Sequence, residues 1–231
     1  ILISVPIWYI VCFLLSGIIC INHIIKYLQQ ADFIGLLCKE KYVLWTMMLF
    51  IMPWFGMVIM KSNLYNGWRH CYFMVPPMIL LIIFGLARIC VLSRVRCSIV
   101  CVLLVGLVSQ CGWIVKNHPY EMVYFNSIGQ KYAEYFDRDY WHLSEIHAWK
   151  YIAEIDDSDT ISVNTSGYQF FTHVLEKNEK KRVEISNNPT YFIETYRGIV
   201  GNQIEKEGYE EIHSIIVDDF KVATIFKKID E

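Results

Sequence analysis

The residues best suited to chemistry stand directly before a long apolar segment, in the run LYNGWRHCYFMVPP at positions 64–77. Asn66-Gly67 favours a tight turn, which fixes the direction of the side chains that follow it. Arg69 has no acidic neighbour in this run, and we expect its planar guanidinium to bind an anionic group such as a lipid phosphate. Two parallel hydrogen bonds from the guanidinium would hold that phosphate. They would also offset the negative charge that develops on the phosphate if it acts as the leaving group of a reaction.

A simpler interpretation of the same run is a membrane anchor. An arginine costs roughly 2.5–3.5 kcal/mol at the centre of a bilayer and much less at its boundary. Arg69 and His70 would then reach the headgroups, while Trp68 and Tyr65 join an aromatic belt. The tight turn favours the binding interpretation, because an anchor needs no fixed direction.

The composition is that of a membrane protein joined to a polar region. The 231 residues are 55% hydrophobic and 15% aromatic. Residues 1–115 contain two acids and eight bases, a net charge of +6, whereas residues 116–231 contain 21 acids and 13 bases, a net charge of −8. A basic apolar half and an acidic polar half therefore underlie the total charge of −2.

The sequence starts with Ile1 inside an apolar run, without the basic leader and small-residue cleavage site of a secretory signal. We therefore expect the C-terminal part of a longer polytopic protein. The eight cysteines all lie before residue 112 and form no CxxC pair. This pattern predicts packing roles for them, and neither a disulfide framework nor a thiolate metal site.

Four segments are long and apolar enough to cross a bilayer, which takes about 20 residues. They must be helical, because hydrocarbon cannot satisfy free backbone N–H and C=O groups. Pro53 and the pair Pro76-Pro77 fall inside them, and we expect these prolines to kink their helices. The segments are about 1–22, 42–60, 71–92 and 97–115.

Charge in the short connections predicts the orientation. Connections 23–41 and 88–96 hold six bases and connection 61–70 holds two, so the positive-inside rule puts the first two in the cytoplasm. Residues 31–38 are apolar but short, which suits an interfacial helix. The chain is then an integral protein of the cytoplasmic (inner) membrane, with the 61–70 loop and everything after residue 115 extracytoplasmic.

The predicted fold is an α-helical polytopic membrane bundle followed by a small extracytoplasmic α/β domain. Residues 116–142 form an aromatic segment between the two, and tyrosine and tryptophan favour the headgroup layer. Residues 143–231 form the domain. Its expected elements are a helix at 143–155 with Ser144 as N-cap, strands at 160–165 and 182–186, a helix at 167–181, and a C-terminal β-hairpin around Asp218-Asp219.

No catalytic motif marks this domain, which lacks a glycine-rich phosphate loop, a nucleophile elbow and a zinc-binding HExxH pattern. His142, Glu145 and His147 fall at i, i+3 and i+5, a poor helical face for a metal, and we interpret them as scattered surface residues. Basic residues are outnumbered and form no stripe, which disfavours nucleic-acid binding. No cofactor is indicated, and a requirement for a divalent metal stays open.

Three stretches resemble one known family. They are LYNGWRHCYFMVPPMILL, HPYEMVYFN at 118–126 and DYWHLS at 139–144. In order and spacing they are similar to stretches near the C-terminal end of integral-membrane glycosyltransferases of the C superfamily, in the branch of the protein O-mannosyltransferases and aminoarabinose transferases. The resemblance covers the chain from Tyr42 to about Ile155 and is weak beyond residue 160.

The resemblance implies transfer of a sugar from a polyprenyl-phosphate-linked donor to a glycan, lipid or protein acceptor at the outer face of the membrane. It implies one wall of the donor-phosphate site, formed by Arg69, His70, Tyr65 and Asn66. It also implies a group that shapes the acceptor entrance or docks the domain, formed by Asp139, Tyr140, Trp141 and Tyr120.

The family's general base is an acidic residue in the first large extracytoplasmic loop. The only acids of this chain before residue 121 are Asp32 and Glu40, both on the predicted cytoplasmic side. The resemblance therefore implies that the base lies upstream, that the catalytic residue is unknown, and that this segment alone is inactive.

Two other classes of protein are weighed against the enzyme. One is a non-catalytic membrane-anchored protein whose acidic extracytoplasmic domain binds a partner. The other is a transporter, which is disfavoured because the predicted helices carry no interior ionisable pair. Acidic residues in an early outer loop would favour the enzyme over the anchor.

Overall fold

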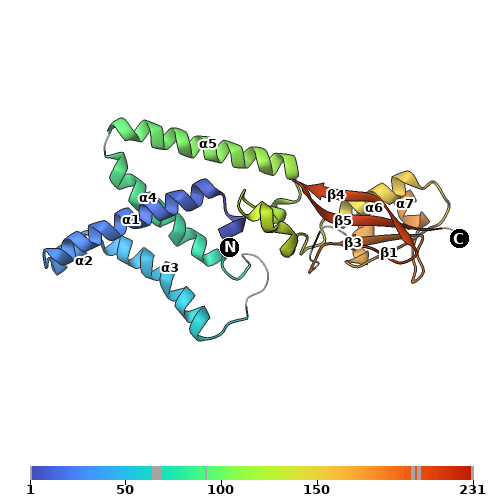
Figure 1. Ribbon diagram of the computed structural model, residues 1–231, viewed down its shortest axis with the longest axis horizontal. Coiled ribbons are helices and arrows are strands. Elements are labelled where there is room, and N and C mark those ends of the chain that lie inside the picture. Colours follow the sequence, from blue (N-terminus) through green and yellow to red (C-terminus); the bar gives the residue numbers. More distant parts are fainter. Residues whose placement is uncertain (1, 64–68, 92, 199–200, 202–203, 230–231) are drawn as a thin grey trace. The chain divides into compact units, whose positions relative to one another are not determined.

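The computed structural model describes residues 2–63, 69–91, 93–198, 201 and 204–229. It divides into two compact units, Ile1–Gly112 and Trp113–Glu231. Figure 1 labels helices α1 to α5 of the first unit and strands β1, β3, β4 and β5 of the second.

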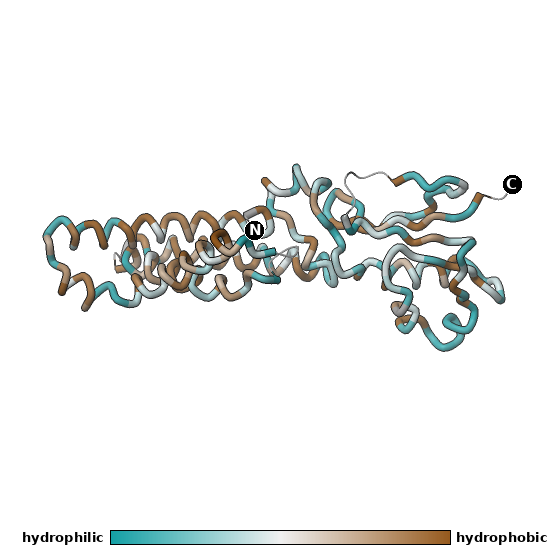
Figure 2. The backbone as a smooth tube through the Cα atoms, turned by 90° about the horizontal axis from the view of Figure 1, so that it is seen from below, coloured by the Kyte–Doolittle hydropathy of each residue, from teal (hydrophilic) through white to brown (hydrophobic). Residues whose placement is uncertain are grey.

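The first unit is built of apolar helices, which are largely brown on the hydropathy scale of Figure 2. Within the described residues, four helices are long and apolar enough to cross a membrane. The helices are α1 (Ile7–Gln29), α2 (Phe33–Lys39), α3 (Lys41–Ile59), α4 (Val75–Cys90) and α5 (Ser93–Asn117), with short 3-10 turns η1 (Leu2–Ser4) and η2 (Tyr72–Met74).

The predicted kink at Pro76-Pro77 is wrong. Both prolines fall in the first turn of α4, which begins at Val75. The first N–H groups of a helix have no intrahelical partner, so a proline there removes no hydrogen bond and starts the helix well. Pro53 does lie inside α3, as expected. The short helix α2 occupies the position predicted for the interfacial helix.

Helices α1 and α4 approach each other closely where Gly85 of α4 meets Ser16 of α1. A Cβ added to Gly85 of α4 would overlap the Cα and side chain of Ser16 in α1. The Ser16 hydroxyl donates to the carbonyl of Ile82 at 3.1 Å. Small residues that let two backbones approach are a common basis of helix association in membranes. Beside this contact, Cys20, Val43 and Leu81 form a buried apolar cluster.

An ionisable pair, Arg88 with Glu40, joins helix ends in the first unit. Arg88 lies in the last turn of α4, not in a connection, because α4 continues to Cys90. Its guanidinium pairs with the buried carboxylate of Glu40 and also donates to the Phe84 carbonyl at 2.9 Å. Glu40 stands between α2 and α3, so the pair lies at helix ends and not in the middle of a span.

The second unit is a mixed five-stranded sheet in the described residues, with the order β2-β1-β3-β5-β4. Parallel pairs join β1 to β2 and to β3, whereas β5 is antiparallel to β3 and β4. The strands are β1 (Ile161–Thr165), β2 (Val183–Ile185), β3 (Tyr191–Thr195), β4 (Tyr209–Val217) and β5 (Phe220–Lys228). The helical elements are η3 (Glu121–Val123), η4 (Gly129–Tyr135), α6 (Glu145–Ile155), η5 (Gln169–Val174) and α7 (Lys177–Arg182).

The predicted C-terminal hairpin is present, formed by β4, β5 and a turn at Asp218-Asp219. The central strand β3 was not predicted, since it has only five residues and follows a turn-forming Asn-Asn-Pro. The helix expected over 167–181 is divided into η5 and α7, because Leu175 and Glu176 are extended and Glu176 starts α7 with a capping box.

The core of the second unit lies between α6 and the sheet. Trp149 and Ile152 of α6 have no exposed surface, and neither has Ile193 of β3 or Ile225 of β5. Full burial of an aliphatic side chain stabilises a fold by roughly 1.5–3 kcal/mol. These contacts fix α6, and with it the residues at its N-terminus, against the carboxyl ends of the parallel strands.

Candidate functional site

Arg69 and His70 are exposed and lie in a turn directly before η2 and the span Tyr72–Cys90. Of the next four residues, Cys71 and Met74 are buried, whereas Tyr72 and Phe73 are exposed. Tyr65 and Asn66, the other two members of the predicted phosphate wall, lie outside the described residues. The structure therefore places an arginine and a histidine at the end of an apolar helix.

The stretch HPYEMVYFN, residues 118–126, is the first part of a longer segment near the start of the second unit. We call this segment, residues 118–136, the collar. The Tyr120 hydroxyl bonds to Nδ1 of His147 on α6, and burial raises the pKa of Tyr120. The side-chain oxygen of Asn126 accepts from the backbone N–H of Gly129 at 2.9 Å, which starts η4. Tyr120 and Asn126 thus hold the collar in shape and attach it to α6.

The stretch DYWHLS forms the turn that starts α6. The buried carboxylate of Asp139 accepts from the backbone N–H of Leu143 at 2.8 Å and of Ser144 at 2.9 Å. The Ser144 hydroxyl donates to the same carboxylate, so the first and last residues of the stretch are in contact. Ser144 is the N-cap residue of α6, as predicted, but its side chain makes no capping hydrogen bond. His142 has a positive φ of 55°, a conformation that histidine adopts more readily than most residues.

Tyr140 and Trp141 lie on the outer side of this turn. The guanidinium of Arg197, which follows β3, lies 4.6 Å from the centre of the Tyr140 ring. The rings of Tyr140 and Trp141 meet edge to face at 5.3 Å. Arg197 is exposed and Trp141 is 41% exposed, so this cation and these rings are accessible from solvent.

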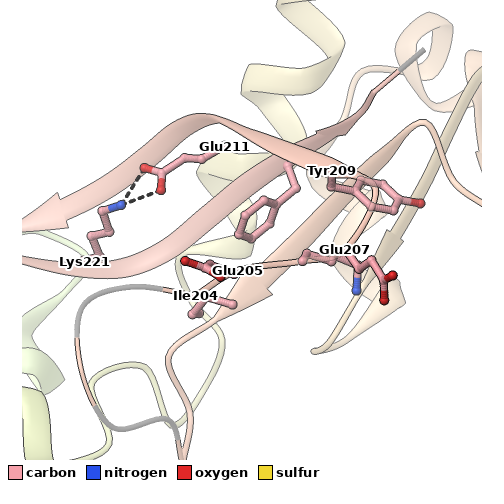
Figure 3. A pocket seen from close by; sticks show the side chains of 8 residues that line it. Ile204, Glu205, Glu207, Tyr209, Glu211 and Lys221 are labelled. Atoms are coloured by element: carbon pink, nitrogen blue, oxygen red, sulfur yellow. Dashed lines mark hydrogen bonds and ion pairs between the residues drawn. The ribbon is translucent and has the colours of Figure 1, made fainter. Parts of the chain in front are cut away.

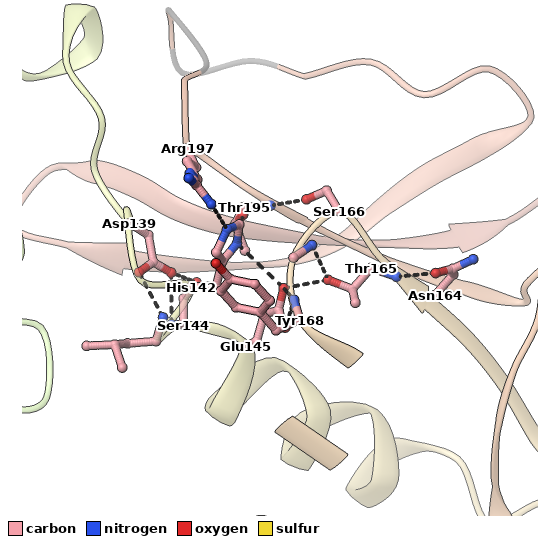
Figure 4. Close-up of polar contacts among 12 residues, drawn as sticks. Asp139, His142, Ser144, Glu145, Asn164, Thr165, Ser166, Tyr168, Thr195 and Arg197 are labelled. Carbon is pink, nitrogen blue, oxygen red and sulfur yellow. Dashed lines mark hydrogen bonds and ion pairs between the residues drawn. The ribbon is translucent and has the colours of Figure 1, made fainter. Parts of the chain in front are cut away.

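His142 links the turn to the end of β3 (Figure 4). Its Nε2 is 3.3 Å from Nη1 of Arg197 and its Nδ1 is 2.6 Å from the Thr195 hydroxyl. A guanidinium only donates, so Nε2 accepts and a neutral imidazole carries its proton on Nδ1. Burial lowers the pKa of His142, Arg197 lowers it further and Asp139 acts in the opposite direction.

Glu145 links the turn to the end of β1. Its Oε1 accepts from the Thr165 hydroxyl at 2.6 Å and lies 3.7 Å from His142 Nδ1, and the backbone N–H of Tyr168 is 3.1 Å from Oε2. A Cβ added to Gly167 would overlap both Glu145 Oε1 and His142 Nδ1, so only glycine fits this loop. Burial raises the pKa of Glu145 to about 7, against the lowering effect of the hydrogen bonds from Thr165 and Tyr168.

The interpretation of His142, Glu145 and His147 as scattered surface residues is therefore wrong for the first two, which are buried. Figure 4 shows their side chains converging with those of Thr165, Thr195 and Arg197. We call these five residues the polar network. His147 is exposed, as predicted, although it bonds Tyr120. The spacing of metal ligands along one helix could not reveal the polar network, because its five residues come from three separate segments of the chain.

The polar network lies at the switch point of the sheet. The chain leaves β1 towards β2 on one side and leaves β3 towards β4 and β5 on the other. In open α/β sheets, ligands bind outside the carboxyl ends of the strands at such a point. Glu145 has no exposed surface, so a ligand here would meet Arg197, Tyr168 and Tyr140 while the buried members hold them in place.

A separate groove of about 810 Å³ lies where the segment after β3 returns to β4. Figure 3 shows its carboxylates, Glu205, Glu207 and Glu211, and the pair between Glu211 and Lys221. Lys221 Nζ is 2.5 and 2.6 Å from the two carboxylate oxygens of Glu211. With Lys206 as the second cation, the groove has one more acid than bases. A hydroxyl-rich or cationic ligand suits this balance better than an anion does.

Within the described part of the chain, no three His, Cys, Asp or Glu side chains are grouped so as to hold a metal ion. No protein-family model, curated protein or solved structure matches this chain.

Proposed function

We propose that this chain is part of a membrane glycosyltransferase that transfers a sugar from a polyprenyl-phosphate-linked donor to a glycan, lipid or protein acceptor. The observation that carries the proposal is the exposed Arg69-His70 pair in a turn directly before the span Tyr72–Cys90. The resemblance of the three stretches to the C superfamily supports it. In this proposal the chain is integral to the cytoplasmic membrane and its sheet unit is extracytoplasmic.

The chemistry assigned to the chain is support of the leaving group. A guanidinium at the headgroup level can hold a lipid-linked phosphate through two parallel hydrogen bonds. That contact stabilises the charge that develops on the phosphate when the sugar departs. We assign no catalytic base among these residues, because the resemblance implies a base in an early extracytoplasmic loop.

Replacement of Arg69 tests the proposal in the complete protein in its own membranes. We expect Arg69→Ala to reduce transfer from a radiolabelled polyprenyl-phosphate sugar by at least 100-fold, which is about 2.7 kcal/mol of transition-state stabilisation. Lys61→Ala, which removes the other base of the same connection, should leave transfer within about twofold. Unchanged transfer in Arg69→Ala, with normal membrane insertion, would exclude the phosphate role.

A second candidate is a non-catalytic membrane-anchored protein whose acidic domain binds a partner. The groove lined by Glu205, Glu207 and Glu211 favours it, since a cavity of about 810 Å³ is large enough for a peptide or glycan segment. If this candidate is right, Glu205→Lys with Glu207→Lys abolishes partner binding and Arg69→Ala has no effect. The two candidates thus respond to different substitutions.

A further inference from the structure

Part of the collar exposes a run of large apolar side chains. Tyr120 and Phe125 are buried, but other members of the collar are exposed. The exposed members are Met122, Ile128, Tyr132, Tyr135 and Phe136, which are 46–61% exposed. A soluble domain has no use for such a concentration of exposed aromatic and aliphatic surface, which marks an interaction site.

The collar is tied to the last turns of α5 by the hairpin between β4 and β5. The Trp113 indole donates to the carboxylate of Asp218, with Nε1 3.0 Å from Oδ2. The side-chain amide of Gln130 lies 3.5 Å from the same Oδ2. Ring contacts add to this link, since Phe125 meets Phe220 edge to face at 5.6 Å. Gln130, near the start of η4, and Trp113 therefore contact the same carboxylate, that of Asp218.

The position of Trp113 sets the depth of the collar. The apolar span of α5 runs from Val95 to Asn117, about 34 Å at 1.5 Å per residue, close to the ~30 Å of a hydrocarbon core. Trp113 stands four residues before the end of this span, about 6 Å along the axis, where tryptophan favours the membrane interface. Gln130, held at the same carboxylate, is then at headgroup depth as well.

We propose that the exposed side chains of the collar insert into the headgroup layer of the bilayer that α5 crosses. Lipid headgroups are the proposed occupant because Trp113 and Gln130 share the Asp218 carboxylate near the end of the apolar span, where the headgroup layer begins. Tyrosine-rich surface of this kind, with the exposed bases Lys116 and Lys131 beside it, suits the boundary between apolar chains and anionic headgroups. The proposal does not depend on glycosyl transfer and applies equally to a non-catalytic anchor.

The polar network lies at the same end of the sheet as the tip of the hairpin. Asp218, at that tip, is held beside Trp113, and β5 starts two residues later at Phe220. Thr195 of β3 pairs with Ala223, three residues from the start of β5 and about 10 Å along the strand. The carboxyl ends of β3 and of its parallel neighbour β1 therefore lie at the hairpin-tip end of the sheet.

Photo-crosslinking in purified full-length protein tests the proposal. Ile128 or Tyr132 is replaced by p-benzoylphenylalanine, and the protein is reconstituted in phosphatidylcholine–phosphatidylglycerol vesicles that carry an alkyne-tagged lipid. The matched control is the same replacement at Ile229, which is 52% exposed and about 30 Å from Phe220 along the strand direction. Val105, a 69% exposed residue of α5, serves as the positive control.

We expect lipid adducts at Ile128 and Tyr132 at least tenfold above those at Ile229, and comparable to those at Val105. Equal labelling at Ile128, Tyr132 and Ile229 would overturn the proposal. A crosslinked dimer in place of a lipid adduct at Ile128 would also overturn it, since a second copy would then cover the collar. Absence of a lipid adduct at Val105 would overturn the proposal as well, because the proposal requires that α5 crosses the bilayer.

Discussion

Glu145 carries a carboxyl group with no exposed surface, held by the Thr165 hydroxyl and the backbone of Tyr168. Its buried environment decides its protonation state. Desolvation is the largest influence and raises the pKa of Glu145 to about 7 from an ordinary 4.5. A buried carboxyl poised near neutral pH can exchange a proton in the range where most enzymes operate. Its effect on stability can be measured directly.

Stability of the sheet unit should fall as the pH rises through the titration of Glu145. The folded pKa is raised, so the stabilisation is fully present below pH 4.5 and is lost as the pH passes about 7. A shift of this size corresponds to about 3 kcal/mol. Glu145→Gln removes this ionisation. Relative to the wild type, the variant should gain about 3 kcal/mol between pH 4.5 and pH 8, measured by native-state hydrogen exchange of the β3 and β5 amides.

His142 titrates in the opposite sense and serves as an internal check. Its folded pKa is lowered by burial, so its contribution is present at high pH and is lost as the pH falls below 6.5. Both proteins retain His142, so their difference isolates Glu145. A difference between wild type and Glu145→Gln that does not change with pH would show that the buried carboxyl does not titrate in this window.

At the scale of elements, α1 and α4 depend on the absence of a side chain at Gly85. An added methyl group would overlap the backbone of Ser16 and separate the two helices, which also weakens the hydrogen bond from Ser16 to Ile82. Rigid backbone on both sides leaves little room for adjustment. An added methyl group at this contact is therefore expected to act like an overpacked core residue, and not like a change at an exposed surface.

Gly85→Ala should destabilise the helical unit by about 1–3 kcal/mol, because the helices must move apart to admit the methyl group. The matched control is Gly56→Ala in α3, where no atom lies within 4 Å of the added Cβ. The control should be neutral or slightly stabilising, since alanine favours a helix more than glycine does. Unfolding by sodium dodecyl sulfate in mixed micelles measures both, and equal stabilities of the two variants would contradict the close approach.

At the scale of the whole molecule, charge is divided between two regions. The first 115 residues carry a net charge of +6 and the remainder carries −8. Positive charge in short connections orients membrane proteins with those connections in the cytoplasm. The same rule predicts that the acidic region, which follows the last span, lies on the other side of the membrane.

Topology is tested with single cysteines in a background from which the eight native cysteines have been removed. Asn178→Cys, at an exposed position in α7, should react with a membrane-impermeant maleimide on intact cells. Gln30→Cys, exposed between α1 and α2, should react only after permeabilisation. Labelling of Gln30→Cys alone on intact cells would reverse the orientation and move Arg69 to the cytoplasmic side.

Local pattern was enough to predict the apolar helices and the C-terminal hairpin. A long apolar run, or two β-rich runs around a turn, can be recognised within one short segment of sequence. Boundaries were less predictable. The last turns of α1 contain His23 and Lys26 and are still helical, since a helix need not end where its apolar run ends. The strand β3 escaped prediction because five residues next to a turn signal give little pattern, and its central place in the sheet supplies its stability instead.

Composition and order along the chain were enough to show an apolar basic half and a polar acidic half, with an arginine and a histidine before one of the apolar helices. Folding in three dimensions was needed to show that His142 and Glu145 are buried and bonded to Thr165 and Thr195 at the ends of two parallel strands. The reason is physical. Hydropathy is a property of each segment, whereas the pKa of Glu145 depends on residues up to 23 positions away that only folding brings within hydrogen-bonding distance.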